Sequence, residues 1–258
     1  WVEKGSGPLV LLMHGFPEFW WSWRKQIDPL SRNFRVVAVD MRGFNESEKP
    51  ATGYDTTTLA KDIRDLIDHL GGPAYVAGHD WGGIIAYQLA MDWPNRVKKL
   101  AILNAPHPDA WIQGWLTHAE QQRKSWYVFF NLLPDFPEEN YKAQFHNGTV
   151  RLARVMPPED VAIYREAFEK PGVAKAAVNY YRELVKQIPE RRDKMPNRIT
   201  CPVRVLWGCR DVALDPIVND IAANWINDME IFYFPKAWHW VAFEKPRAVT
   251  RHLREFFQ

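Results

Sequence analysis

The stretch Gly78–Gly83 (GHDWGG) follows directly on the apolar run Ala74–Ala77. It has the form of a nucleophile elbow, in which a strand turns sharply into a helix with the attacking residue at the turn. The attacking position is Asp80, where a serine is usual. The flanking glycines permit the close backbone approach of such a turn. A carboxylate attacks an electrophilic carbon and leaves an alkyl ester, so the motif favours chemistry at saturated carbon.

The residues after Asp80 support a helix. The stretch 82–91 is apolar nearly throughout, as expected of a buried helix. Its free N–H groups and dipole favour negative charge at its N-terminus, so the carboxylate should stay ionised. An ordinary N-cap aspartate after a glycine turn has the same local sequence, and the assignment therefore depends on partners elsewhere in the chain.

Size and composition narrow the class of protein. The 258 residues, 47% of them apolar, suffice for one large α/β domain or for a core with an insertion. A net charge of +2 without a basic stripe argues against nucleic acid as a partner. No apolar run is long enough to span a bilayer. Cys201 and Cys209 form neither a disulfide framework nor a metal-binding spacing, which fits a cytoplasmic location. No signal peptide is recognisable, although the start at Trp1 leaves room for a leader.

Short β-type runs alternate with amphipathic helical patterns along most of the chain. The six runs are Leu9–Met13, Phe34–Val39, Ala74–Ala77, Val97–Leu103, Val203–Trp207 and Ile231–Phe234. Apolar residues recur at helical spacing from Leu59 to Leu70, and an N-cap is expected within Thr56–Thr58. This alternation predicts a mostly parallel sheet with helices on both faces.

The alternation breaks between Asn104 and about Cys201, where helical periodicity, prolines and many aromatic residues replace the strand pattern. We expect an α/β core over residues 1–104 and 197–258 and an inserted helical cap over 105–196. Placed after a strand, the cap would cover the carboxyl ends of the sheet, where such sheets bind ligands. The alternative is a separate helical domain, which its position within the α/β pattern disfavours.

Four further features match the elbow: an acid, a histidine, the loop after the first run and a pair of tyrosines. An acid, Asp211, lies just past the run Val203–Trp207, and a histidine, His239, lies just past the last run. The order nucleophile, acid, histidine is that of the elbow architecture. His239 would activate a water and Asp211 would orient the imidazole. Asp109, which also follows a strand, is the rival acid.

The loop after the first run, His14–Pro17, would supply one oxyanion N–H, that of Phe16, and the residue after the nucleophile, Trp81, would supply the other. In the helical stretch, Tyr127 and Tyr181 are candidate proton donors to a developing alkoxide. Adjacent residues on a helix point about 100° apart, so one of Tyr180 and Tyr181 can pack while the other faces the cleft. The competing interpretation is that the tyrosines only anchor the cap.

Together these residues resemble the epoxide hydrolases of the α/β-hydrolase superfamily. The matching stretches are His14–Glu18 with Trp23-Arg24, Asp40–Phe44, Gly78–Gly83, Trp207–Asp211, His239, Ser125–Phe130 and Asn179–Arg182. The resemblance covers nearly the whole chain. It departs at Asn45, where glycine is frequent, and in starting one or two strands later than is usual.

The resemblance implies an α/β-hydrolase fold and a reaction on epoxides that needs no cofactor or metal, serving either detoxification or a biosynthetic step. Asp80 would open the ring, Tyr127 and Tyr181 would protonate the oxygen, and water activated by His239 would release a vicinal diol. The substrate would be a small lipophilic epoxide, and the protein would act as a monomer or homodimer. Further residues are expected to contact the substrate: His14, Pro17, Trp126, Tyr180 and Trp240.

Two other functions remain as alternatives. A haloalkane or haloacid dehalogenase shares the aspartate and histidine. Haloalkane dehalogenases usually carry a polar residue at the position of Phe16, and fluoroacetate dehalogenases usually carry arginine at that of Trp81. A non-catalytic ligand receptor on the same fold is the second alternative, although such proteins usually lose part of the triad.

Overall fold

Seven strands form the central sheet, and the computed structural model describes all residues 1–258. In chain order they are β1 (Val2–Lys4), β2 (Leu9–Met13), β3 (Arg35–Val39), β4 (Ala74–His79), β5 (Val97–Leu103), β6 (Val203–Gly208) and β7 (Met229–Phe234). The spatial order is β1-β3-β2-β4-β5-β6-β7, and every neighbouring pair is parallel except β1 with β3. The mostly parallel sheet expected from the sequence is confirmed, and the parallel strands bring their carboxyl ends to one edge.

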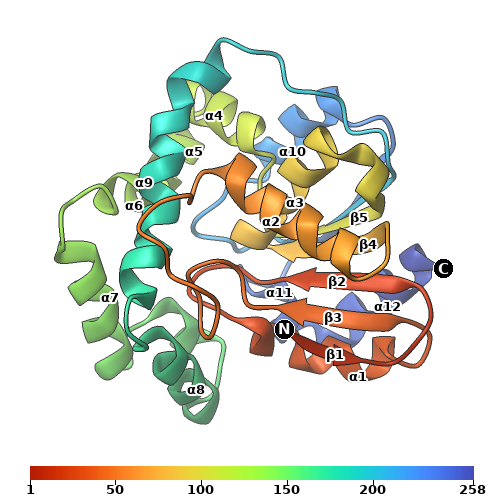
Figure 1. The fold of residues 1–258 in the computed structure, drawn as a ribbon. Coiled ribbons are helices and arrows are strands. Elements are labelled where there is room, and N and C mark those ends of the chain that lie inside the picture. The colour runs from red at the N-terminus through yellow and green to blue at the C-terminus, as the bar shows by residue number, and fades with distance from the viewer.

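Helices cover both faces of the sheet (Figure 1). The main ones are α1 (Arg24–Leu30), α2 (Thr56–His69), α3 (Trp81–Asp92) and α12 (Pro246–Phe257). Shorter elements complete the layers: η1 (Trp20–Trp23), η2 (Pro94–Arg96), α10 (Ile217–Ala222), η4 (Ala223–Trp225) and α11 (Val241–Glu244).

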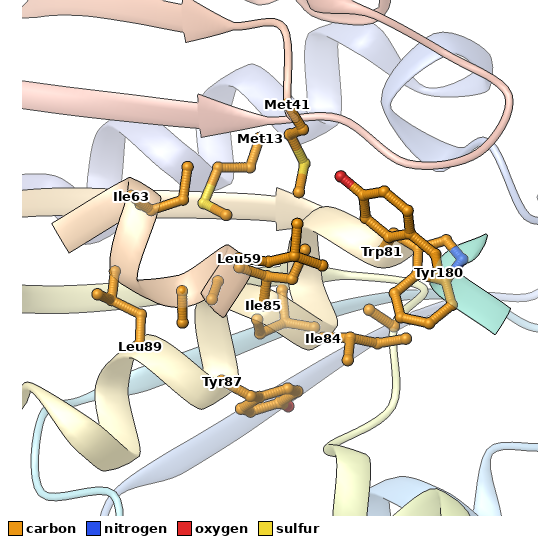
Figure 2. Packing of buried hydrophobic residues seen from close by; sticks show 14 of the residues in the cluster. Met13, Met41, Leu59, Ile63, Trp81, Ile84, Ile85, Tyr87, Leu89 and Tyr180 are labelled. Atoms are coloured by element: carbon orange, nitrogen blue, oxygen red, sulfur yellow. The ribbon is translucent and has the colours of Figure 1, made fainter. Parts of the chain in front are cut away.

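Two apolar cores lie on opposite sides of the sheet because successive strand side chains point to opposite faces. Leu11 packs in the core that includes α2 and α3, whereas its neighbour Leu12 packs in the core that includes α1 and α12. Figure 2 shows part of the first core, with Leu59 of α2 beside Ile85 of α3. Because helices cover both faces of the sheet, the side chains on both sides of strands such as β2 are buried. Such strands therefore appear in the sequence as continuous apolar runs.

Between β5 and β6 the chain forms helices without a strand of the sheet, and we call α4 to α9 the helical insertion. Its elements are α4 (Pro108–Thr117), α5 (Ala119–Lys124), α6 (Trp126–Phe130), α7 (Phe136–His146), η3 (Arg151–Arg154), α8 (Pro158–Phe168) and α9 (Val173–Arg192). In Figure 1, α7 and α9 lie beyond the arrowheads of β2 and β3, at the carboxyl edge of the sheet.

Half-buried ion pairs and hydrogen bonds join parts of the helical insertion to one another and to the core. Arg182 of α9 donates to Glu138 of α7 at 2.7 Å. Arg191, near the end of α9, donates to both oxygens of Asp109 at 3.1 Å and to Thr56 of α2 at 2.7 Å. These contacts fix α9 against α2 and α4.

Two details differ from the sequence-based expectation. The strand β1 pairs antiparallel with β3 and was overlooked, because its three largely exposed residues form no apolar run. The N-cap of α2 is Asp55, not a threonine within Thr56–Thr58: its side chain accepts from the N–H of Thr58 at 2.9 Å. An aspartate oxygen satisfies this free helix donor as well as a hydroxyl does. No helix combines the length and apolar character needed to cross a membrane.

Candidate active site

Asp80 occupies the turn between β4 and α3 in a backbone conformation that few residues other than glycine adopt. Its φ is +50°. The glycines around it are required by space: a Cβ at Gly78 would lie 2.4 Å from the carbonyl oxygen of Gly82, and one at Gly82 would lie 2.4 Å from that of Met13. The turn is therefore held by backbone packing, which points the Asp80 side chain out of the sheet edge.

The Asp80 carboxylate meets two groups from other loops. Its Oδ1 accepts the N–H of Phe16 at 2.8 Å, and its Oδ2 lies 3.3 Å from Nε2 of His239. Trp81, the second expected oxyanion donor, is the first residue of α3, where backbone N–H groups have no partner within the helix. The loop and the elbow thus meet at one carboxylate.

The charges around Asp80 keep it ionised. Burial by itself raises the pKa of this carboxyl, but the hydrogen bond and charge of His239, the charge of His79 and the Phe16 N–H together lower it below its usual value. A carboxylate that is ionised at neutral pH is the form that can attack carbon.

His239 lies between two carboxylates. Its Nδ1 is 2.6 Å from Oδ2 of Asp211, opposite the contact with Asp80. Burial lowers the pKa of His239, but Asp211 and Asp80 outweigh that effect and hold it well above the usual value. Burial likewise raises the pKa of Asp211, and the charge of His239 with several hydrogen bonds brings it below normal.

Of the two candidate acids, the structure places Asp211 and not Asp109 beside His239. The second oxygen of Asp211 accepts the N–H groups of Ala213 at 2.8 Å and Leu214 at 3.1 Å, so its orientation is fixed. Asp109 is instead paired with Arg191, and burial raises its pKa despite that partner.

Asn104 is a site residue that sequence reasoning missed. It follows β5 with a φ of +38°, donates from Nδ2 to Oδ2 of Asp211 at 2.8 Å, and accepts the N–H of Gly208 at 2.8 Å. It therefore ties the acid to the end of β6. The signal was a polar residue at the end of a buried strand.

A second pair, Glu18 and His79, was also missed. Nδ1 of His79 lies 2.7 Å from Glu18, and Nε2 lies 2.9 Å from the carbonyl oxygen of His239. Both nitrogens of this ring are therefore engaged, one by a carboxyl group and the other by a backbone carbonyl. The pair holds the backbone of His239 in place.

A cavity of about 280 Å³ opens at Asp80, and a second one of about 20 Å³ also borders this residue. Asp80, Tyr127 and Tyr181 line both. The rings of the two tyrosines are 5.8 Å apart, in an edge contact. Burial, and then the negative charge of Asp80, raise the pKa of both phenols, which keeps them protonated as hydrogen-bond donors.

Three of the five residues expected to contact substrate line the larger cavity: Pro17, Trp126 and Trp240. Tyr180 does not, because it points into the core beside Trp81 and donates its O–H to the carbonyl of Arg42 at 2.6 Å (Figure 2). His14 does not either. Its ring is fully buried between the carbonyl of Gly15 and the N–H of Met41, which occupy both nitrogens. Both residues organise the loops behind the cavity.

No group of three or more histidine, cysteine, aspartate or glutamate side chains is arranged to hold a metal ion. Beside Asp80, the cavity brings together a carboxylate paired with a histidine and two neighbouring phenols. This arrangement can supply a nucleophile, a base and two proton donors from the chain itself.

Comparisons with known proteins identify the fold and the family. The family model of the alpha/beta hydrolase fold matches residues 8–246. Epoxide hydrolase 4 of Mus musculus is 34% identical over 271 residues, covering 99% of this chain and 74% of the mouse protein. Epoxide hydrolase 2 of Caenorhabditis elegans is 31% identical, with 99% and 76% covered.

Solved structures give the same result. The epoxide hydrolase of Bacillus megaterium, determined in complex with an inhibitor, superposes with a TM-score of 0.90 at 30% identity, covering 99% of this chain and 95% of that one. The chain belongs to the epoxide hydrolases of the α/β-hydrolase superfamily.

Proposed function

We propose that this chain hydrolyses epoxides to vicinal diols through a covalent ester on Asp80. The observation that carries the proposal is that the two oxygens of this carboxylate have different partners. The N–H of Phe16 binds one oxygen, His239 faces the other, and two phenols line the same cavity. The relatives named as epoxide hydrolases support the substrate class.

In the first step, Oδ2 of Asp80 attacks a ring carbon from the side opposite its C–O bond. That bond breaks, its electron pair moves to the ring oxygen, and a proton from Tyr127 or Tyr181 neutralises the alkoxide. Oδ1 remains as the ester carbonyl oxygen, because the Phe16 N–H already holds it. The product is a hydroxyalkyl ester.

In the second step, water attacks the ester carbonyl carbon while His239 takes its proton. The N–H groups of Phe16 and Trp81 stabilise the oxyanion. Its collapse breaks the bond between the carboxyl carbon and the alkyl oxygen, which takes the proton from His239 and leaves as the diol. The proton balance closes when the regenerated Asp80 carboxylic acid gives its proton to the phenolate. The helical insertion, residues 105–196 in the proposed division, acts as the cap that encloses both steps.

The two carboxylates beside His239 explain why the pKa of this histidine would differ between the first and the second step. In the resting site, Asp80 and Asp211 both raise the pKa of His239. Esterification removes the charge of Asp80, so the pKa of His239 falls and the imidazole becomes a base when a water must be activated. Asp211 remains to stabilise the imidazolium that forms.

The test combines product analysis with isotope labelling. Wild type should convert an aryl epoxide to its diol and release no halide from a haloalkane of similar size, and Asp80→Ala should form no diol while retaining its circular dichroism spectrum. With enzyme in excess over epoxide in ¹⁸O-water, the label should enter the peptide that contains Asp80 and not the first diol. Label in the first diol would instead mean direct attack of water on the epoxide.

A further inference from the structure

One wall of the larger cavity carries a cation that has no acidic partner. Arg151, the first residue of η3, lines this cavity together with Asp80 and Tyr127. Its guanidinium carbon lies 5.7 Å from the ring centre of Trp126 and 5.8 Å from that of Tyr127, and it forms no salt bridge. In the same helical insertion, Arg182 and Arg191 each bind a carboxylate.

One polar neighbour of Arg151 in the cavity, Asn140, also has a donor without an acceptor. Asn140 and Gln144 lie one turn apart on α7 and carry the two side-chain amides that line this cavity. The amide of Gln144 donates to the oxygen of Asn140, which leaves Nδ2 of Asn140 as a donor without a partner. The remaining lining is mainly apolar, including Phe130, Val150 and Leu152. Asp80 is the one acidic side chain that lines the cavity, and it is paired with His239 and not with Arg151.

A buried or half-buried guanidinium is usually paired, because removing it from water without an acceptor is unfavourable. A substrate that fills the cavity would displace water from Arg151. A neutral substrate would leave the cation without an acceptor, whereas a carboxylate matches the planar fork of the guanidinium with two hydrogen bonds.

We propose that Arg151 is a specificity-determining residue that binds a carboxylate on the substrate, and that this protein prefers compact epoxides bearing an acidic group. The inference rests on the proposed function. Arg151 lies against the ring of Tyr127, whose O–H would hold the epoxide oxygen. The carboxylate and the epoxide must therefore be separated by about one aromatic ring, and the charge of a long-chain acid would lie outside this contact.

The test uses a matched pair of substrates, 4-carboxyphenyl glycidyl ether and its methyl ester, which differ in charge but share the epoxide. Wild type should show the higher kcat/KM on the acid. Arg151→Gln should lower the ratio of acid to ester by roughly tenfold, as expected for loss of a hydrogen-bonded charge. Arg154→Gln removes the same charge from the same 3-10 helix, but Arg154 lies outside the larger cavity and should keep the ratio.

The dependence of the acid-to-ester ratio on salt concentration is an independent test. Because Arg151 is partly exposed, its attraction for the acid is screened, and the wild-type ratio should fall as sodium chloride is raised to about 0.5 M. The ratio of Arg151→Gln should not change. If Arg151→Gln melts at a lower temperature than wild type, Arg151→Lys provides the second variant. Lysine retains the positive charge but lacks the planar guanidinium that donates two parallel hydrogen bonds. The acid-to-ester ratio of Arg151→Lys should therefore lie between those of wild type and Arg151→Gln.

An unchanged ratio in Arg151→Gln, or an equal loss in Arg154→Gln, would overturn the proposal. So would a wild-type enzyme that hydrolyses the ester as well as or better than the acid. Failure of the proposed function looks different: wild type would form diol from neither substrate, and no Asp80 adduct would appear with either.

Discussion

The two halves of the candidate site are held in different ways. At the sheet edge, the backbone of Asp80 is fixed by glycines that leave no space for a Cβ, and His239 is held by Asp211 and by the His79 contact to its carbonyl. In the helical insertion, Tyr127 and Tyr181 are held by ring contacts, and no protein acceptor binds either O–H.

The difference follows from what each group would have to do. The nucleophile and the base must be held in fixed positions, whereas a proton donor must keep its O–H free of protein partners. A nucleophile and a base need fixed positions with respect to one carbon atom, because small displacements lower the rate strongly. A proton donor needs an O–H that is not used by the protein. Tyr180 makes the contrast clear, since its O–H is bound to Arg42 and it belongs to the core.

The strongest test of the sheet-edge half is His239→Gln. It should leave ring opening intact and block ester hydrolysis, lowering steady-state turnover by a factor on the order of 10³ or more, as for loss of other catalytic bases. Intact-mass spectrometry after one turnover should show one substrate mass added to the chain. Asp80→Ala, treated identically, should show no added mass. An unmodified His239→Gln protein would remove the histidine from the second step.

The rigidity of the elbow is tested by Gly82→Ala, whose new methyl group would lie 2.4 Å from the carbonyl oxygen of Met13. We expect a loss of about 3 kcal/mol in the free energy of unfolding, because the neighbouring atom is backbone. The control is Gly148→Ala in the helical insertion, where φ is +65° but no atom lies within 4 Å of the new Cβ. It should lose about 1 kcal/mol. Urea denaturation measures both, and equal losses would contradict a specially packed elbow.

The donor role of the insertion is tested by three phenylalanine substitutions. Tyr181→Phe and Tyr127→Phe should each slow formation of the ester roughly tenfold to a hundredfold, because each removes a proton donor to the alkoxide. Tyr180→Phe, next to Tyr181 on α9, should change that rate little and lower the unfolding free energy by about 1 kcal/mol through its lost hydrogen bond. Stopped-flow tryptophan fluorescence follows the first step. A slow Tyr180→Phe would reverse the assignment of the two adjacent tyrosines.

The smallest expected effect is a shift in the titration of His239. Its pKa is raised in the folded protein, with Asp80 among the causes, so in Asp80→Asn it should be less raised. The stabilising contribution of a raised histidine pKa is complete below the unfolded value, about 6.5, and is lost as pH rises through the folded pKa. The variant should lose this contribution over a lower pH range than wild type. Histidine side-chain NMR reports the titration, with His239→Gln identifying the resonance; identical titrations would exclude the coupling.

The parts of the site that sequence could predict are those encoded by neighbouring residues. The elbow is readable because its strand, glycines and Asp80 are contiguous, and the acid and histidine were found because each follows a strand. Asn104 and Glu18 were missed because their hydrogen bonds join residues 107 and 61 positions apart. Their local sequences are those of ordinary loop residues.

The residues expected to contact the substrate show the same limit of prediction from sequence. Sequence identified the two adjacent tyrosines of α9 and left open which of them faced the cleft, because the answer depends on how the whole helix is rotated against the core. His14 was expected at the substrate and is instead enclosed by backbone groups from its own loop and from Met41. Such placements are set by tertiary packing, which no local pattern encodes.

The unequal cavities beside Asp80 have a stereochemical consequence for the proposed reaction. One holds about 280 Å³ and the other about 20 Å³, and Asp80, Tyr127 and Tyr181 line both. In that reaction, an epoxide with one bulky and one small substituent would bind with the bulky group in the larger cavity, so mirror-image substrates would present different ring carbons to Asp80. Attack from the back would invert the carbon that is attacked. The proposed reaction should therefore distinguish mirror-image epoxides.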